Sequence, residues 1–198
     1  ADPVGGFAIC LLPGSDNQDA LELAADSLVE LFSDVLYKGV PGAFGPVFEQ
    51  YYRQSLFLLM QADPQDRVLA NIPRIFQETA FRQDLLGRCH DRNVRDFWTQ
   101  TATRATGDID LTNVTPYIIS KLARFIGTAL GRRLFPGSAT SIDFRAAIDS
   151  GKILILRCPK GDLGEGLASL AMSAAVLKLR DALAARAAVN RSSRRPVR

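Results

Sequence analysis

Apolar residues recur at helical spacing in the first third of the chain. From Leu21 to Val35 they fall three or four positions apart and lay one stripe along a predicted helix. A second helix is predicted from Pro46, because proline is tolerated in a first turn. Pro64 stops this helix, since a proline disfavours helical geometry in the residue before it.

The same spacing continues through the middle of the chain. Residues 66–106 predict three short helices. Thr115-Pro116 predicts the start of a longer helix, which ends at the breakers of residues 135–137. Because no convincing strand pattern interrupts this block, it predicts a compact all-α unit.

Two short apolar runs depart from helical spacing and predict strands. Residues 7–12 form the first, closed by Pro13-Gly14. Residues 153–156 form the second, and four consecutive aliphatic side chains are typical of a strand buried on both faces.

The second run lies between two predicted helices. Residues 142–148 suit a short helix, and residues 165–187 suit a long one that is apolar nearly all round at its start, which predicts burial. Strand, loop and helix form one βα unit. Since two strands cannot make a stable sheet, further strands are expected from polypeptide outside this sequence.

These patterns predict a mainly α fold with an incomplete α/β part. Residues 1–14 are assigned to a strand and turn of an α/β core, and residues 15–137 to an all-α insertion domain. Residues 138–198 are assigned to the strand-loop-helix return into that core.

Composition is that of a soluble globular protein, with 47% hydrophobic and 23% charged residues. No apolar run approaches the roughly 18 residues of a membrane span, and residues 1–3 do not resemble the start of a signal peptide. The three cysteines are odd in number and widely spaced, which favours reduced thiols in a cytoplasmic protein. The absence of an initiator methionine indicates an excised segment.

Positive charge is concentrated at the end of the sequence. From Lys178 to Arg198 there is a surplus of six positive charges against +3 for the whole chain, so residues 1–177 carry −3. Such a tail can bind phosphate backbones, or it can be a solvated linker, which is the simpler interpretation.

Six cations are candidate contacts for a nucleotide or DNA: Arg157, Lys160, Lys121, Arg124, Arg132 and Arg133. The first two rank highest because they flank the end of the predicted buried strand, and ligands of open α/β sheets gather at the carboxyl ends of strands. For the other four, a solvated helix face or a favourable position at a helix C-terminus is the simpler interpretation.

The sequence carries no complete catalytic motif. Residues 161–166 place glycines between a strand and a helix, but no Gly-Lys-Ser/Thr follows, and the carboxylates of Asp162 and Glu165 would repel phosphate. His90 is the only histidine, beside Cys89, with no second ligand at metal spacing. No catalytic residue, metal ligand or cofactor is therefore assigned to this chain.

Several short motifs follow one another along the last two thirds of the chain. They are Ala80-Phe81-Arg82, Val94-Arg95-Asp96-Phe97-Trp98, Ile119-Ser120-Lys121-Leu122, Ile142-Asp143-Phe144-Arg145, Ile153-Leu154-Ile155-Leu156 and Lys160-Gly161-Asp162-Leu163-Gly164. Their order and spacing resemble the coupling proteins of type IV secretion systems, which are conjugative DNA-transfer P-loop ATPases related to hexameric DNA-pumping motors. The resemblance covers residues from about 65 to the end, and more loosely the first 65.

The resemblance implies an internal fragment between the Walker A and Walker B motifs of a RecA-like core. Neither motif lies within the sequence, so ATP and Mg²⁺ are implied only for the parent protein. The parent would be a hexamer that moves DNA, expected as single strands, and contacts secretion-channel or relaxosome proteins. It would work in the cytoplasm or attached to the inner membrane.

Two other functions stay open at this point. The chain can be a stand-alone helical protein-interaction module, or a nucleic-acid-binding domain that uses its basic C-terminal tail.

Overall fold

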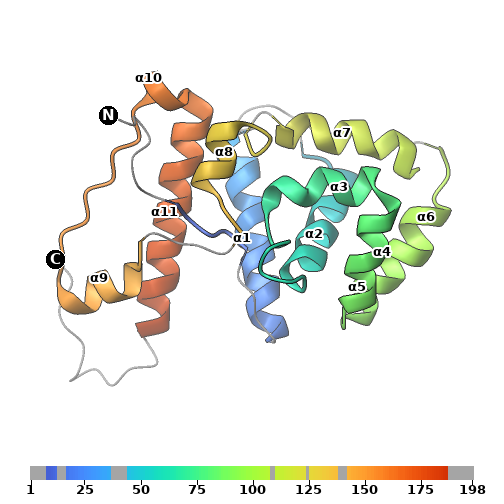
Figure 1. Ribbon diagram of the computed structural model, residues 1–198, viewed down its shortest axis with the longest axis horizontal. Coiled ribbons are helices and arrows are strands. Elements are labelled where there is room, and N and C mark those ends of the chain that lie inside the picture. Colours follow the sequence, from blue (N-terminus) through green and yellow to red (C-terminus); the bar gives the residue numbers. More distant parts are fainter. Residues whose placement is uncertain are drawn as a thin grey trace.

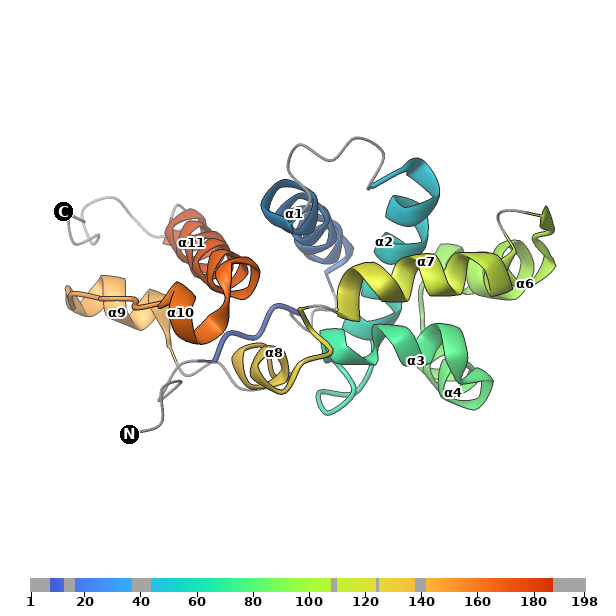
Figure 2. The same cartoon turned by 90° about the horizontal axis from the view of Figure 1, so that it is seen from above.

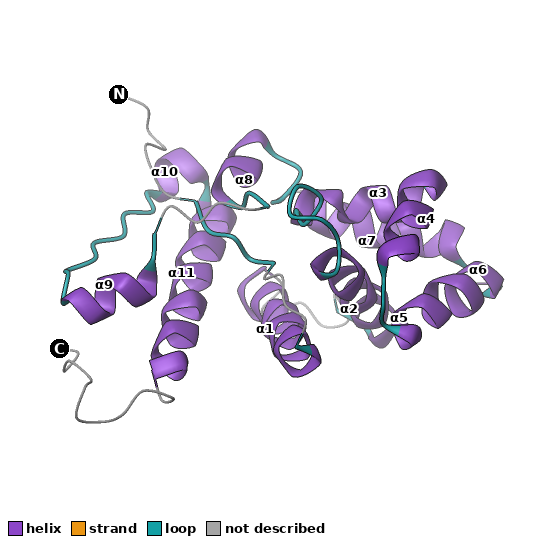
Figure 3. Cartoon of the chain, turned by 60° about the horizontal axis from the view of Figure 1, so that its bottom comes forward, coloured by secondary structure: helices purple, strands orange, loops and turns teal. Residues whose placement is uncertain are grey.

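The computed structural model describes residues 8–12, 17–36, 44–107, 110–123, 125–137 and 142–186. These residues form a mainly helical fold, with no strand among them, which confirms the mainly α prediction (Figures 1 and 3). In chain order the elements are α1 (Gln18–Leu36), α2 (Pro46–Met60), the 3₁₀ turn η1 (Leu69–Asn71), α3 (Ile72–Gln77), α4 (Thr79–Arg88), α5 (Arg92–Asp96), the π-helical turn η2 (Phe97–Thr101), α6 (Ala102–Arg104), α7 (Leu111–Ala123), α8 (Ala129–Leu134), α9 (Phe144–Ser150), α10 (Lys160–Leu163) and α11 (Glu165–Ala185).

Helix α2 is the centre of the core. Its side chains Phe48, Tyr52 and Leu56 are fully buried, and Tyr52 meets Phe32 of α1 edge to face with ring centroids 5.4 Å apart. The stripe predicted on α1 is buried at Leu21 and Leu28 among others. Both first helices are therefore where the periodicity predicted them.

Residues 66–106 fold as the three predicted helical stretches. The first is η1 with α3, the second is α4, and the third runs without interruption through α5, η2 and α6. Asp91 starts the third stretch, because its carboxylate accepts hydrogen bonds from the N–H groups of Asn93 and Val94. The sequence pattern is confirmed here.

The predicted helix start at Thr115-Pro116 is wrong. Helix α7 begins at Leu111 and contains Pro116. Asp110 fixes this earlier start, since its carboxylate accepts a hydrogen bond from the Thr112 N–H at 2.7 Å.

The same prediction also missed a helix boundary. The chain turns after α7 and begins α8 at the Thr128 cap, whose hydroxyl oxygen accepts the Gly131 N–H at 2.9 Å. Gly131 permits this turn because an added Cβ would lie 1.9 Å from the Phe125 carbonyl oxygen.

The predicted N-terminal strand is not formed. Residues 8–12 are extended, but the Ile9 N–H donates to the Leu134 carbonyl oxygen of α8 at 2.8 Å instead of pairing with a strand. Ile9, Leu11 and Leu12 are nonetheless buried, so the apolar run enters the helical core. Residues 1–7 and Pro13-Gly14 lie outside the described part of the chain.

The last third keeps its predicted helices. Asp143 caps α9, and Gly151 ends it with a left-handed φ of 68°, a conformation that favours glycine. Helix α11 begins at Glu165 as predicted, but only one of its faces is buried, while Met172 and Val176 are exposed. The prediction of burial all round the start of α11 is therefore wrong, because no described element covers its second face.

The aliphatic run between these helices is extended but forms no strand. Ile153 and Ile155 are 89% and 87% exposed, so the prediction of a strand buried on both faces is wrong for this chain. The physical reason is that no other described segment runs beside it as a strand. The partial RecA-like α/β part is consequently not seen.

Helix α1 contacts one helix from the first third of the chain and one from the last third. It packs against both α2 and α11, and in Figures 1 and 2 it lies between α11 and the group formed by α2 to α7. A guanidinium N–H of Arg180 in α11 donates to the Ser27 hydroxyl of α1 at 2.8 Å. The predicted domain boundary at residue 137 stays a prediction. Helix α1, before that boundary, contacts α11, which follows it.

Candidate functional site

The candidate cations do not converge on one site. Arg157 lies in the stretch between α9 and α10 and Lys160 is the first residue of α10, whereas Lys121 belongs to α7 and Arg132 and Arg133 belong to α8. The side chains of the last two are exposed, and Arg132 donates to the Gly127 carbonyl oxygen.

Lys121 is engaged within the fold. Its ammonium lies 4.1 Å from the centroid of the Tyr117 ring and 5.7 Å from that of Phe48. These distances are typical of cation–π contacts, so the helix face is held by aromatic packing. Arg124, its predicted partner on that face, lies outside the described residues, as does the basic tail after Arg186.

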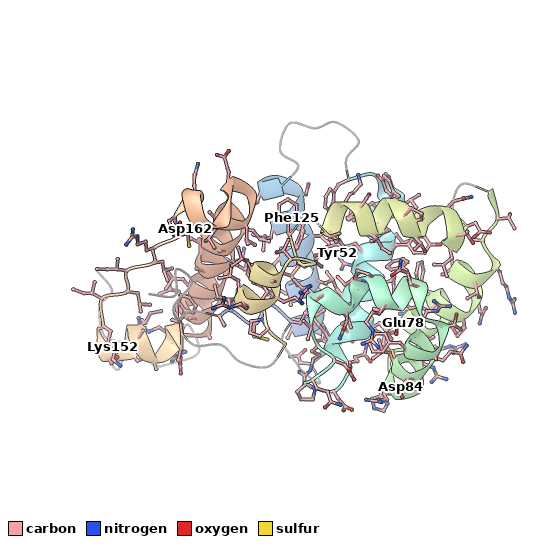
Figure 4. All side chains as sticks on the ribbon, turned by 45° about the horizontal axis from the view of Figure 1, so that its top comes forward. Tyr52, Glu78, Asp84, Phe125, Lys152 and Asp162 are labelled. Atoms are coloured by element: carbon pink, nitrogen blue, oxygen red, sulfur yellow. The ribbon has the colours of Figure 1, made fainter. Side chains whose placement is uncertain are left out.

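The site that remains is built on residues 152–158, here called the open segment. It follows α9 and runs beside α11 to α10 (Figure 1). In Figure 4 it extends between the labelled residues Lys152 and Asp162, with side chains projecting on both sides of the backbone. Leu156 and Cys158 are half-buried against the core, whereas Ile153 and Ile155 are exposed. Burial thus alternates along the segment with the two-residue period of a β-strand.

From residue 153 onward, the backbone of the open segment is unpaired among the described residues. The Lys152 N–H donates to the Ala147 carbonyl oxygen at 2.9 Å, and the next backbone hydrogen bond along the chain runs from the Asp162 N–H to the Pro159 carbonyl oxygen at 3.2 Å. Between these points, residues 153–158 make no backbone hydrogen bond to any described residue. The segment has the conformation of a strand without a neighbour.

The glycine-containing turn that follows is partly helical. Residues 160–163 form α10, and Gly164 links it to α11 with φ 74°. The Lys160 ammonium donates to the Glu165 carboxylate at 2.8 Å, and this bond, with the charge of Lys160, lowers the pKa of Glu165. Lys160 is therefore largely neutralised, and the predicted pair of cations is reduced to Arg157.

A cavity of about 330 Å³ separates the end of the open segment from α11. It is lined by Cys158, Lys160, Ala168, Ser169, Met172 and Ser173. Burial raises the pKa of the Cys158 thiol, so the thiol stays protonated near neutral pH and is a poor nucleophile. Two hydroxyls, a thiol and a paired ammonium can orient a small polar group, but they supply no catalytic base.

Sequence reasoning missed the α11 residues of this cavity. Ser169, Met172 and Ser173 stand at i, i+3 and i+4, so helical spacing places them on one face. Helical spacing thus puts these three side chains together, but only the structure shows that they face the end of the open segment.

An ion-pair cluster forms around Asp149, just before the open segment in the sequence, and sequence analysis did not predict it. Asp149 of α9 receives Arg186, 3.1 Å away at the end of α11, and Arg145, 2.5 Å away in its own helix. The Arg186 side chain is almost fully buried, which makes this contact a tie between α9 and α11.

The remaining chemistry-bearing residues are structural. The exposed His90 donates its backbone N–H to the Gln61 side-chain oxygen at 3.0 Å, and Cys89 beside it is buried. All three cysteines are free thiols. Among the described residues no cluster of three or more His, Cys, Asp or Glu side chains has the geometry of a metal site. No described helix is long and apolar enough to cross a membrane.

Comparison of this chain with protein-family models, with curated proteins and with solved structures found no match.

Proposed function

We propose that this chain is part of a hexameric, ATP-driven DNA-translocating motor of the conjugative coupling type. The observation that carries the proposal is the open segment, an aliphatic run in β conformation with no paired strand among the described residues. Such a run is expected where a chain crosses an α/β core whose other strands come from further polypeptide.

The relation of the open segment to α11 supports the same proposal. Its inward side chains face a long helix that follows after a short turn, which is the order of a βα unit. Arg157 lies near the carboxyl end of the segment, the end at which α/β sheets gather ligands. In the assembled motor, Arg157 is the residue of this chain that we assign to a nucleotide or DNA contact.

The described residues do not themselves fit an ATP site. The only lysine at the glycine-containing turn is paired with Glu165, and Asp162 adds a second carboxylate there. Nucleotide and Mg²⁺ would be held by Walker motifs outside this sequence. The role of this chain is then to contribute the helical unit that contacts DNA or partner proteins.

The natural reading frame around this sequence tests the proposal first. We expect it to encode GxxxxGK[ST] before Ala1 and an apolar strand ending in acidic residues after Arg198. The complete product should hydrolyse ATP faster when DNA is added, and Arg157→Ala should reduce that stimulation more than Arg133→Ala does. A reading frame confined to these residues would refute the motor and leave a helical interaction module.

A further inference from the structure

We propose that the open segment is a docking edge for a β-strand whose aliphatic centre is flanked by carboxylates. The inference rests on the backbone and charges of residues 152–158 and not on the motor assignment. It shares the unpaired open segment with the proposed function, and the experiments below distinguish the failure of one proposal from the failure of the other.

The unpaired backbone determines the conformation of the partner. Six consecutive residues, 153–158, are extended and make no backbone hydrogen bond to described residues. A row of free N–H and C=O groups on an extended chain is a template for strand addition, in which main-chain hydrogen bonds supply the affinity. An incoming helix could not satisfy these groups, since its own are already paired.

The side chains determine the composition of the partner. Ile153 and Ile155 present an exposed aliphatic face, and Leu154 on the opposite side is still 40% exposed. Apolar side chains on the incoming strand would cover this surface, because cross-strand neighbours of this kind stabilise a sheet.

The charges at the two ends of the aliphatic run determine what flanks the partner. Lys152 and Arg157 are both exposed, and neither forms an ion pair with a described residue. Lys160 differs, because Glu165 already neutralises it. The open segment thus presents two uncompensated positive charges, one before and one after its aliphatic residues.

These charges also argue against a second copy of the chain as the partner. In an antiparallel pair of identical segments that aligns all four aliphatic residues, Lys152 of each copy lies opposite Arg157 of the other. Like charges placed directly opposite each other destabilise a sheet. A strand with carboxylates at those positions turns both contacts into attractions.

The test is binding of a probe with fluorescein on its N-terminus, fluoresceinyl-Glu-Thr-Val-Thr-Val-Glu-amide, to the whole chain, measured by fluorescence anisotropy. Its glutamates are separated by four residues, as Lys152 and Arg157 are, so that each glutamate can lie opposite one cation in an antiparallel pair. The matched probe replaces both glutamates with lysine. We expect the acidic probe to bind more tightly, with a preference that weakens as ionic strength rises. The double variant Lys152→Glu/Arg157→Glu should reverse the preference, with a change of roughly tenfold for each probe.

A second pair of variants tests the backbone. Leu154→Pro/Ile155→Pro removes one N–H from each edge of the segment and should abolish binding, whereas Leu154→Val/Ile155→Val keeps both N–H groups and should retain it. Circular dichroism of each variant verifies that the helices are intact. Hydrogen exchange should show slower exchange at residues 153–156 when the acidic probe is bound.

Four results would overturn the proposal. The first is equal binding of the two probes by the unmodified chain, and the second is retained binding by the folded proline variant. The third is concentration-dependent dimerisation that the proline variant loses, which would make a second copy the partner. DNA-stimulated ATP hydrolysis by the parent without probe binding here would keep the motor and exclude the docking edge.

Discussion

Replacing the two outward isoleucines of the open segment should cost almost no folding stability. Full burial of an isoleucine side chain contributes about 1.5–3 kcal/mol relative to exposure. At 89% and 87% exposure, Ile153 and Ile155 retain about a tenth of that contribution. Ile153→Thr and Ile155→Thr are therefore each expected to lower the free energy of unfolding by about 0.2–0.4 kcal/mol, since threonine keeps the β-branched shape.

Leu170→Ala is the matched control on the neighbouring helix. Leu170 is fully buried in α11, so its truncation leaves a cavity and should cost about 2–5 kcal/mol. Urea unfolding followed by far-ultraviolet circular dichroism measures all three variants on one scale.

One outcome would contradict the reasoning. A loss of about 1.5 kcal/mol or more at either isoleucine would mean that its side chain is buried in the folded chain. The open segment would then be covered from within, and both the docking edge and the main support for the motor would fall.

Three further predictions concern the helical core and its thiols. Gly131→Ala should lower the free energy of unfolding by about 1–3 kcal/mol, because the added Cβ would meet the Phe125 carbonyl oxygen. Gly87→Ala in α4 has nothing within 4 Å of its added Cβ, so thermal unfolding should show a gain of about 0.5–1 kcal/mol. Tyr52→Phe should cost nothing and can gain about 1 kcal/mol, since the buried hydroxyl has no hydrogen-bond partner among the described residues; a clear loss in urea unfolding would show that it has one. Burial raises the pKa of the Cys89 thiol, so its alkylation, measured by peptide mass spectrometry, should be slow at neutral pH and faster as pH rises. Alkylation of Cys89 before that of the half-buried Cys10 would contradict the burial of Cys89.

Local signals predicted most helices because they act within a few residues. The apolar stripe from Leu21 to Val35 and the end of α9 at Gly151 both follow from residues that are neighbours in the sequence. The start of α7 differs from the prediction because Asp110, whose side chain caps the helix locally, begins it before Thr115-Pro116.

The candidate site was less predictable, because its properties depend on neighbours distant in sequence. The aliphatic run from Ile153 to Leu156 was predicted as a strand buried on both faces, but it is extended without forming a strand, and its exposure follows from what lies beside it in space. Likewise, the charge of Lys160 was visible in the sequence, but its pairing with Glu165 depended on the turn formed by α10 and Gly164.

The sequence by itself determined that this protein is mainly helical and where one aliphatic run interrupts the helices, since periodicity and caps are local properties. Only the tertiary structure decided that α1 packs on α11, that one face of α11 stays exposed and that the open segment has no paired strand in the described part of the chain. The physical reason is that burial and hydrogen-bond pairing belong to pairs of segments. A sequence pattern describes only one member of each pair.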